Sequence, residues 1–262
     1  MRSSTTDETL ALEDRTATDR KYPVTKRFLV FQHMPWEGPG QNLLQTARNA
    51  DFLLDIVEVW HASIPEMTSY DGLMVLGGSP NVDQEEEFPF LRAEKAAIRE
   101  VIKEDKPFMG FCLGHQLLAE ALGAKVGPNF SRSVGFVEGH VTEDGRRHPV
   151  FEGMPKSFPL FKWHAQAVLS PLPKALDVLV TSSECEVEAC CVKGRPHVLG
   201  LQFDNQAATV TDIQGWVEGD RAWLRQPPKV DTEAIVKNAA RYEAVIGKQF
   251  QCMFDSYVRL IL

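Results

Sequence analysis

The fold is decided by residues 110–116, which read Gly-Phe-Cys-Leu-Gly-His-Gln. They follow a short apolar run and open a helical one, so Cys112 lies where a strand turns into a helix, with a glycine two residues to either side. This pattern is typical of a nucleophile elbow, a tight turn that presents one reactive side chain. We expect both glycines to be needed, because the turn leaves no room for side chains and requires backbone angles that other residues resist. We also expect the helix dipole to favour the thiolate of Cys112.

Apolar strands alternate with helices along the first half of the chain. Strands are predicted at 28–32, 52–60, 73–76 and 107–110, and helices at 43–50, 90–104 and 117–122. Short strands that are apolar throughout, separated by helices, indicate a mostly parallel central sheet with helices on both faces. Ligands of such sheets bind beyond the carboxyl ends of the strands, where Cys112 and the loop Gly77-Gly78 both lie. We therefore expect an α/β fold with one site at this edge of the sheet.

The second half of the chain, residues 133–203, is rich in predicted strands. In the segment 184–191, alternation places four small side chains on one face and three glutamates on the other: Cys185, Val187, Ala189 and Cys191 against Glu184, Glu186 and Glu188. A buried strand explains these cysteines better than a metal site, because no paired CxxC motif or histidine ligand set accompanies them. We expect neither a metal ion nor a cofactor.

Length and composition indicate one sizeable globular domain with additions. The chain has 262 residues, of which 44% are hydrophobic. We expect a flexible N-terminal tail at 1–24, an α/β domain at 25–226, and a C-terminal helical extension at 227–262 that starts at the Pro227-Pro228 pair. The extension carries an apolar stripe at helical spacing, which would either cover the core or form a dimer contact.

Charge and cysteine content argue against several classes of partner. The net charge is −8 with acidic and basic residues interspersed, which disfavours nucleic acids and anionic membranes as partners. No apolar run approaches the length of a membrane span. The five cysteines are irregularly spaced and no export signal precedes them, so we expect reduced thiols and a cytoplasmic location.

The elbow, the Gly77-Gly78 loop and the order of the strands resemble class I glutamine amidotransferase domains. The resemblance is closest to stand-alone members similar to the glutaminase domain of GMP synthetase, including gamma-glutamyl peptidase-like proteins. Residues 71–80, Asp-Gly-Leu-Met-Val-Leu-Gly-Gly-Ser-Pro, resemble the family's oxyanion-loop strand, and residues 161–164, Phe-Lys-Trp-His, resemble a Trp-His motif of this subgroup. The resemblance extends from about Arg27 to Gln206.

This resemblance implies a flavodoxin-like α/β fold and the attack of a cysteine thiolate on the side-chain amide of glutamine. Ammonia leaves, a thioester forms, and water or another acceptor resolves it. By the resemblance, Cys112 is the nucleophile, Gly77 and Gly78 form the oxyanion loop, and the backbone N–H groups of Gly78 and Leu113 are the oxyanion donors. Gln116 would help to hold the substrate, a small amide such as glutamine or a gamma-glutamyl compound.

The chain departs from the family at the end of the last strand. The family ends this strand with Gly-x-Gln-Phe-His-Pro-Glu, whereas residues 200–206 read Gly-Leu-Gln-Phe-Asp-Asn-Gln. Asp204 therefore stands at the position of the catalytic histidine, and Gln206 at the position of the glutamate that orients it. An aspartate with an ordinary pKa near 4 is a weak base at neutral pH, and its charge raises the pKa of a neighbouring thiol. We expect ordinary glutaminase activity to be much reduced or absent.

Another histidine could take over the role of base, and His164 is the best candidate. It belongs to the Trp-His motif, although the aspartate that usually follows two residues later is Gln166 here. Both a catalytic and a structural role stay open for His164. His115 is expected to pack structurally and His33 is a weaker candidate near the site. The other four histidines are expected to be ordinary surface or strand residues: His61, His140, His148 and His197.

These observations leave three functions to compare. The first is a divergent enzyme in which Cys112 performs acyl transfer or hydrolysis on a gamma-glutamyl amide or a related amide. The second is a pseudo-amidotransferase that acts as a binding or regulatory protein. The third, a plain glutaminase that supplies ammonia to a synthetase, requires the missing histidine and is disfavoured. A homodimer and a complex with a partner enzyme both stay open.

Overall fold

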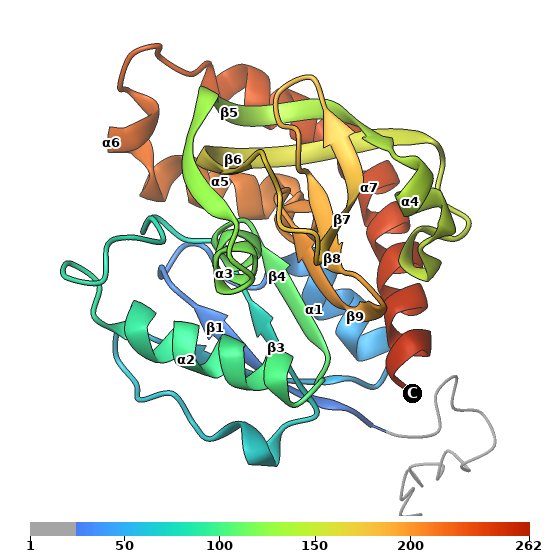
Figure 1. Ribbon diagram of the computed structural model, residues 1–262. Helices are drawn as coiled ribbons and strands as arrows, with labels where there is room; N and C mark the ends of the chain where they lie inside the picture. The colour runs from blue at the N-terminus through green and yellow to red at the C-terminus, as the bar shows by residue number, and fades with distance from the viewer. Residues whose placement is uncertain (1–24) are drawn as a thin grey trace, which may run out of the picture.

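The computed structural model describes residues 25–262, and the tail predicted at 1–24 lies outside the described residues. Within them, the strands form one nine-stranded sheet (Figure 1). Its first five strands are parallel to one another, in the order β2 (Leu53–Glu58), β1 (Arg27–Gln32), β3 (Gly72–Val75), β4 (Phe108–Phe111) and β9 (Arg195–Leu201). The sheet continues with antiparallel pairings through β8 (Ala189–Val192), β7 (Leu176–Ser182), β5 (Lys125–Val141) and β6 (Ser157–Leu169).

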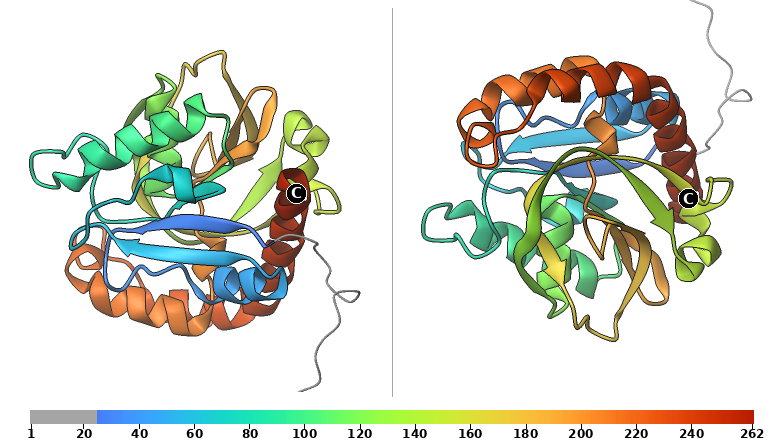
Figure 2. Two further views of the ribbon diagram at one scale, coloured as in Figure 1. Left: turned by 90° about the horizontal axis from the view of Figure 1, so that it is seen from below. Right: turned by 90° about the horizontal axis from the view of Figure 1, so that it is seen from above.

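Helices cover both faces of the parallel strands, as the alternation of strands and helices predicts (Figure 2). On one face lie α2 (Phe90–Lys103) and α3 (Leu113–Ala121); on the other lie α1 (Gln41–Asn49) and α7 (Thr232–Ile261). Within β1, Leu29 and Phe31 pack with the first pair of helices, while Phe28 and Val30 pack with the second. The remaining helices of the described chain are α4 (Glu143–Arg147), α5 (Val210–Gly219), α6 (Arg221–Leu224), η2 (Met67–Ser69), η3 (Pro149–Phe151) and η4 (Asn205–Ala207).

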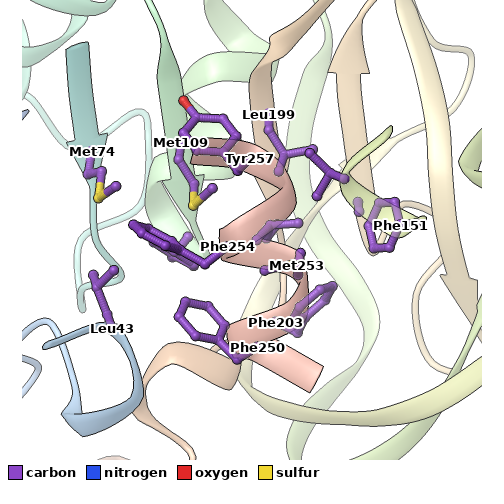
Figure 3. Close-up of a cluster of buried hydrophobic side chains, with 14 of the residues drawn as sticks. Leu43, Met74, Met109, Phe151, Leu199, Phe203, Phe250, Met253, Phe254 and Tyr257 are labelled. Carbon is purple, nitrogen blue, oxygen red and sulfur yellow. The ribbon is translucent and has the colours of Figure 1, made fainter. Parts of the chain in front are cut away.

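The C-terminal extension is a single long helix, α7, whose apolar stripe covers the core. Figure 3 shows its side chains facing those of the parallel strands and of α1: Phe250, Met253, Phe254 and Tyr257 against Leu43, Met74, Met109 and Leu199. Each of these four α7 side chains is at most 2% exposed, and burial of one such side chain contributes roughly 1.5–3 kcal/mol. Of the two roles left open for the stripe, the structure therefore supports covering the core.

The alternation predicted for residues 184–191 is only partly right. The strand β8 begins at Ala189, and the preceding residues form a turn in which Ser182 Oγ accepts the N–H groups of Glu184 and Cys185 at 3.1 Å each. The three cysteines of the segment are buried, as expected. The prediction is wrong for Glu188: its side chain does not face outward with the other two glutamates but is fully buried in an ion pair with Lys162.

The strands and helices predicted around the elbow agree with the structure to within about four residues at each end. Among residues 25–262, no helix is both long enough and apolar enough to span a bilayer. The parallel order β1-β3-β4-β9 matters most for the site, since it brings together the segments that follow the carboxyl ends of these four strands.

Candidate active site

Cys112 occupies a sharp turn between β4 and α3. Its backbone angles are φ 46° and ψ −103°, a conformation that costs strain in any residue with a Cβ. The turn is held from two sides, since the Cys112 N–H donates to Leu201 O at 2.8 Å and the Gly114 N–H donates to Leu76 O at 3.3 Å. The structure thus has the geometry of a nucleophile elbow.

The two glycines of the elbow are required for close approach and not for unusual backbone angles. Neither is among the residues with positive φ; the only positive φ of the turn falls on Cys112. A Cβ at Gly110 would lie 2.5 Å from the carbonyl of Gly114, and a Cβ at Gly114 would lie 2.2 Å from Val75 O. The expectation of glycine-specific angles is therefore wrong, whereas the expectation that side chains would not fit is confirmed.

The Gly77-Gly78 loop follows β3 and is held by His33, which follows β1. His33 Nδ1 lies 2.8 Å from Gly77 O, and its Nε2 lies 2.9 Å from Glu94 Oε1. Burial lowers the pKa of His33, but Glu94 and the Gly77 carbonyl outweigh burial, and the net pKa is raised. These two contacts hold the loop beside Cys112, and the raised pKa favours the protonated imidazole, which can donate to both partners.

Asp204 follows β9 and is completely buried. Its N–H donates to Phe161 O at 2.8 Å, and its Oδ1 accepts from Gln206 Nε2 at 3.0 Å, while its Oδ2 has no hydrogen-bond partner among the described residues. Burial raises the pKa of Asp204 to about 7, against the Gln206 hydrogen bond and the charge of Lys162, which lower it. The expectation of an ordinary carboxyl pKa near 4 is therefore wrong, because that expectation took no account of burial.

Cys112, Asp204 and Glu37 face the same small space. An ideal Cβ at Gly77 would lie 3.4 Å from each of Cys112 Cβ, Asp204 Oδ1 and Glu37 Oε2. Burial, followed by the charges of Asp204 and Glu37, raises the pKa of the Cys112 thiol well above its ordinary range. The opposing effects of Lys162 and the Leu113 N–H are smaller. The expected preference for thiolate is thus wrong, and the expected effect of Asp204 on the thiol is confirmed.

A buried ion pair lies behind this space. Lys162 of β6 pairs with Glu188, both side chains are fully buried, and Ser182 Oγ donates to the second oxygen of Glu188 at 2.5 Å. The charge of Lys162 lowers the pKa values of Cys112 and Asp204. Sequence reasoning missed this pair, although a lysine inside the apolar strand 157–163 was a visible signal.

His164 is buried and neutral. Its Nδ1 lies 2.8 Å from Gln166 O, so Nδ1 carries the proton, and Nε2 has no hydrogen-bond partner among the described residues. Burial and then Lys162 lower its pKa well below the ordinary value. His164, Cys185 and Glu188 bring one potential metal ligand each within 4.8 Å, but Glu188 already neutralises Lys162, whose charge would repel a cation. These three residues therefore do not fit a metal ion.

The remaining histidines lie away from the reacting groups or pack structurally. As expected, His115 is buried in α3, where its Nδ1 contacts the Cys190 sulfur at 3.7 Å, and burial lowers its pKa to about 3. His148 was expected to be an ordinary surface or strand residue, but it is buried and caps η3 by accepting the Val150 N–H at 3.3 Å.

One pocket of about 170 Å³ opens over Cys112. Of the residues selected from the sequence, four line it: Gly78, Cys112, Gln116 and His164. The other four are not among its lining residues: Gly77, Leu113, Asp204 and Gln206. The amide nitrogen of Gln116 donates to Gln166 O at 3.0 Å and to Gln202 Oε1 at 3.1 Å, which fixes this side chain at the pocket wall.

Sequence reasoning missed two carboxyl groups that also line the pocket, Glu37 and Asp220. Asp220 accepts the indole N–H of Trp36 at 3.1 Å and that of Trp163 at 2.7 Å, and a hydrogen bond links it to Glu37. Burial and then the charges of Asp220 and Asp204 raise the pKa of Glu37 well above its ordinary value. The position of Glu37 beyond the carboxyl end of β1 was a signal that could have found it; Asp220 lies after the region of resemblance and had none.

Comparisons with known proteins agree with this geometry. The family model described as glutamine amidotransferase class I matches residues 38–204. The chain is 32% identical to one of the subunits of the glutamine-hydrolyzing GMP synthase of Methanothermobacter thermautotrophicus over 130 residues, which is 50% of this chain and 62% of that protein. It is 33% identical to the glutamine amidotransferase-like protein YfeJ of Salmonella typhimurium over 158 residues, 59% of this chain and 64% of that protein. Each match thus spans less than two thirds of the relative.

A solved structure supports the fold over nearly the whole described chain. The crystal structure of a glutamine amidotransferase from Thermotoga maritima superposes with a TM-score of 0.79 at 24% identity, covering 90% of this chain and 99% of that one. The resemblance inferred from the elbow and the strand order is confirmed by these matches. The chain belongs to the class I glutamine amidotransferase family.

Proposed function

We propose that this protein hydrolyses or transfers the acyl group of a gamma-glutamyl amide or a related amide, with Cys112 as nucleophile and Asp204 as proton carrier. The observation that carries the proposal is the buried Asp204 carboxyl, whose pKa is raised to about 7 and whose Oδ1 faces the same small space as Cys112, while its Oδ2 has no hydrogen-bond partner among the described residues. A general base works best when its pKa lies near the operating pH. Burial gives Asp204 the basicity that an imidazole would have at this position.

In the first step, Cys112 Sγ attacks the carbonyl carbon of the amide while the thiol proton passes to the Asp204 carboxylate. The carbonyl oxygen takes the negative charge, and the N–H groups of Gly78 and Leu113 are the proposed donors to it. Removal of one such donor costs about 3 kcal/mol in comparable enzymes. The carbon–nitrogen bond then breaks, the nitrogen takes the proton from Asp204, and a thioester remains on Cys112.

In the second step, water attacks the thioester carbon and gives its proton to Asp204, which returns it to the leaving sulfur. The products are a carboxylic acid and the free thiol; an amine in place of water gives acyl transfer. Because the thiol pKa is raised, little thiolate exists before the substrate binds. Proton transfer therefore accompanies the attack of sulfur instead of preceding it.

Basicity favours Asp204 over His164 as the base. Each residue has one atom without a hydrogen-bond partner among the described residues, Asp204 Oδ2 and His164 Nε2. The His164 pKa is lowered well below its ordinary value, which makes His164 a weak base, whereas the Asp204 pKa is raised to about 7. The role of His164 as a substitute base stays a prediction that mutation can separate from the role of Asp204.

The test measures release of ammonia or amine from glutamine and gamma-glutamyl amides, with a search by mass spectrometry for an acyl adduct on Cys112. We expect Cys112→Ala to abolish turnover, Asp204→Asn to lower kcat/KM by about 10²–10⁴-fold, and His164→Ala to have a smaller effect. The pair Asp204→His and Gln206→Glu should raise glutaminase activity. Turnover that survives in Cys112→Ala would contradict the proposal.

A second candidate function is a pseudo-amidotransferase that binds an amide without turnover. The observation that favours it is the raised thiol pKa of Cys112, which both Asp204 and Glu37 increase. For this candidate, the wild-type protein would bind the amide but form neither product nor adduct, and Cys112→Ala would bind it equally well.

One relative is named as a subunit of GMP synthase, so we also propose that this protein works with a partner enzyme. A class I domain that works within such a complex would pass its ammonia to a partner enzyme. Size-exclusion chromatography with light scattering, with and without a candidate synthetase, would separate this complex from a homodimer.

A further inference from the structure

We propose that the pocket over Cys112 selects amides that carry a protonated amine and no carboxylate close to it. This inference rests on the proposed function only in so far as both use the same pocket. It names the chemical class of ligand, which neither the elbow nor the family assigns to this chain.

The charges on the pocket wall all have one sign. Glu37 and Asp220 line the pocket, and no lysine or arginine is among the described residues that do so. The cation behind the wall, Lys162, is fully buried and paired with Glu188. Arg132 stacks on Trp223 at 5.1 Å but is not part of the lining, and its guanidinium donates to three backbone carbonyls: those of Trp223, Gln226 and Pro228. A ligand carboxylate would therefore meet no free cation here.

The two carboxyl groups are built into the site and are not surface residues that happen to be acidic. Glu37 is only 5% exposed, and Asp220 is held by the indole N–H groups of Trp36 and Trp163. The hydrogen bond between Glu37 and Asp220 joins two carboxyl groups, so it requires a shared proton. A bound ammonium group could replace the shared proton, because it brings both a positive charge and N–H donors to the carboxylates of Glu37 and Asp220.

A third carboxyl group strengthens the same field. Asp204 is completely buried and its Oδ2 has no partner among the described residues. Its other oxygen and Glu37 Oε2 would both contact a Cβ placed on Gly77, at 3.4 Å each. Asp204 does not line the pocket, but its charge acts on Glu37, which does, and so adds to the negative potential that a ligand would meet there.

Two indole rings complete the preference for a cation. Trp163 and Trp223 both line the pocket, with ring centroids 6.1 Å apart and an angle of 46° between the rings. Aromatic walls attract an ammonium group through their quadrupole and repel a carboxylate. Free glutamine meets the carboxyl groups with its ammonium but brings a carboxylate into the same space, so an amide without that carboxylate fits better.

The test is calorimetric binding of four ligands to the Cys112→Ala protein at pH 7 and low salt. Glutaminamide carries an ammonium and no carboxylate, N-acetylglutaminamide carries neither, glutamine carries both, and N-acetylglutamine carries only the carboxylate. We expect glutaminamide to bind at least about tenfold more tightly than N-acetylglutaminamide, and N-acetylglutamine to bind most weakly. Equal affinities for the first two ligands, or no binding of any ligand, would overturn the proposal.

Variants show which carboxyl groups are responsible. Glu37→Gln and Asp220→Asn should each remove most of the preference for glutaminamide, and two variants keep the test valid if one of them fails to fold. The matched control is Glu218→Gln, which lies two residues before Asp220 and removes an exposed carboxylate paired with Arg221. If Glu218→Gln loses the preference for glutaminamide to the same extent, the proposed recognition by Glu37 and Asp220 is overturned. Because the protein lacks Cys112, failure of the proposed chemistry would not alter these results.

Discussion

Replacement of Asp204 by asparagine should stabilise the protein at alkaline pH while it removes activity. Burial raises the folded-state pKa of Asp204 from 3.8 to about 7, and the side chain is fully buried. A carboxyl with a raised folded pKa contributes its stability at pH values below 3.8 and loses it as the pH rises through about 7. Each pKa unit corresponds to about 1.4 kcal/mol, so by pH 8 the ionisable side chain costs the folded protein about 4 kcal/mol.

The measurement is urea unfolding of wild-type and Asp204→Asn at pH 5 and pH 8, followed by tryptophan fluorescence. At pH 5 the ionisation cost in wild-type is about 1.5 kcal/mol, so the difference in unfolding free energy between the two proteins should change by about 2.5 kcal/mol across this range. Asparagine keeps the acceptor for Gln206 but presents an N–H pair where Oδ2 has no partner among the described residues. That defect costs about 1–3 kcal/mol, independently of pH.

Activity supplies the second half of the test. Because Asp204 accepts a proton in its ionised form, kcat/KM of wild-type should rise with pH through about 7, and the variant should lose this rise together with most of its turnover. Asp83→Asn, at an exposed carboxylate, is the matched control. The same pH dependence of unfolding free energy in wild-type and Asp204→Asn, or a variant that keeps wild-type kcat/KM, would refute this reasoning.

The packing and charge around the elbow support three further predictions. Gly114→Ala should lower the unfolding free energy by about 3 kcal/mol, because its Cβ would lie 2.2 Å from Val75 O; an unchanged urea midpoint would contradict this. Lys162→Met should cost about 3–5 kcal/mol by leaving Glu188 charged and unpaired, whereas adding Glu188→Met should recover most of the loss. Alkylation of Cys112 by iodoacetamide should be slow at pH 7 and still accelerate above pH 9, and a plateau near neutrality would show a low thiol pKa instead.

The fold and the elbow could be predicted because their signals are local. The strands β3 and β4 are apolar throughout and fully buried, and each ends at a glycine-containing turn that reads clearly in the sequence. The pKa values of the site residues could not be predicted in the same way. The pKa of Asp204 depends on its burial and on Lys162, which lies in β6, more than forty residues earlier in the chain.

The pocket wall was the part furthest from prediction. Asp220 lies beyond the residues that resemble the family, and at the site it accepts hydrogen bonds from Trp36 and Trp163, which belong to two other segments. Glu188 was misassigned because alternation assumes a regular strand, whereas β8 begins at Ala189. The omission of Asp220 and the misassignment of Glu188 both arise from tertiary contacts that a periodic pattern does not contain.

The three departures from the family's last motif are physically coupled in this structure. A glutamate at position 206 would set a second carboxyl group against Asp204, where Gln206 instead donates a hydrogen bond at 3.0 Å and lowers the Asp204 pKa. Asn205 accepts the Phe161 N–H at 2.8 Å and donates to Pro159 O at 3.0 Å, two bonds that a proline side chain could not form. The segment after β9 is thus tied to β6 around a buried carboxyl group. Simple loss of the catalytic histidine would not require these hydrogen bonds at positions 205 and 206. We therefore favour a replacement of the histidine by Asp204 as proton carrier over a loss of the catalytic function.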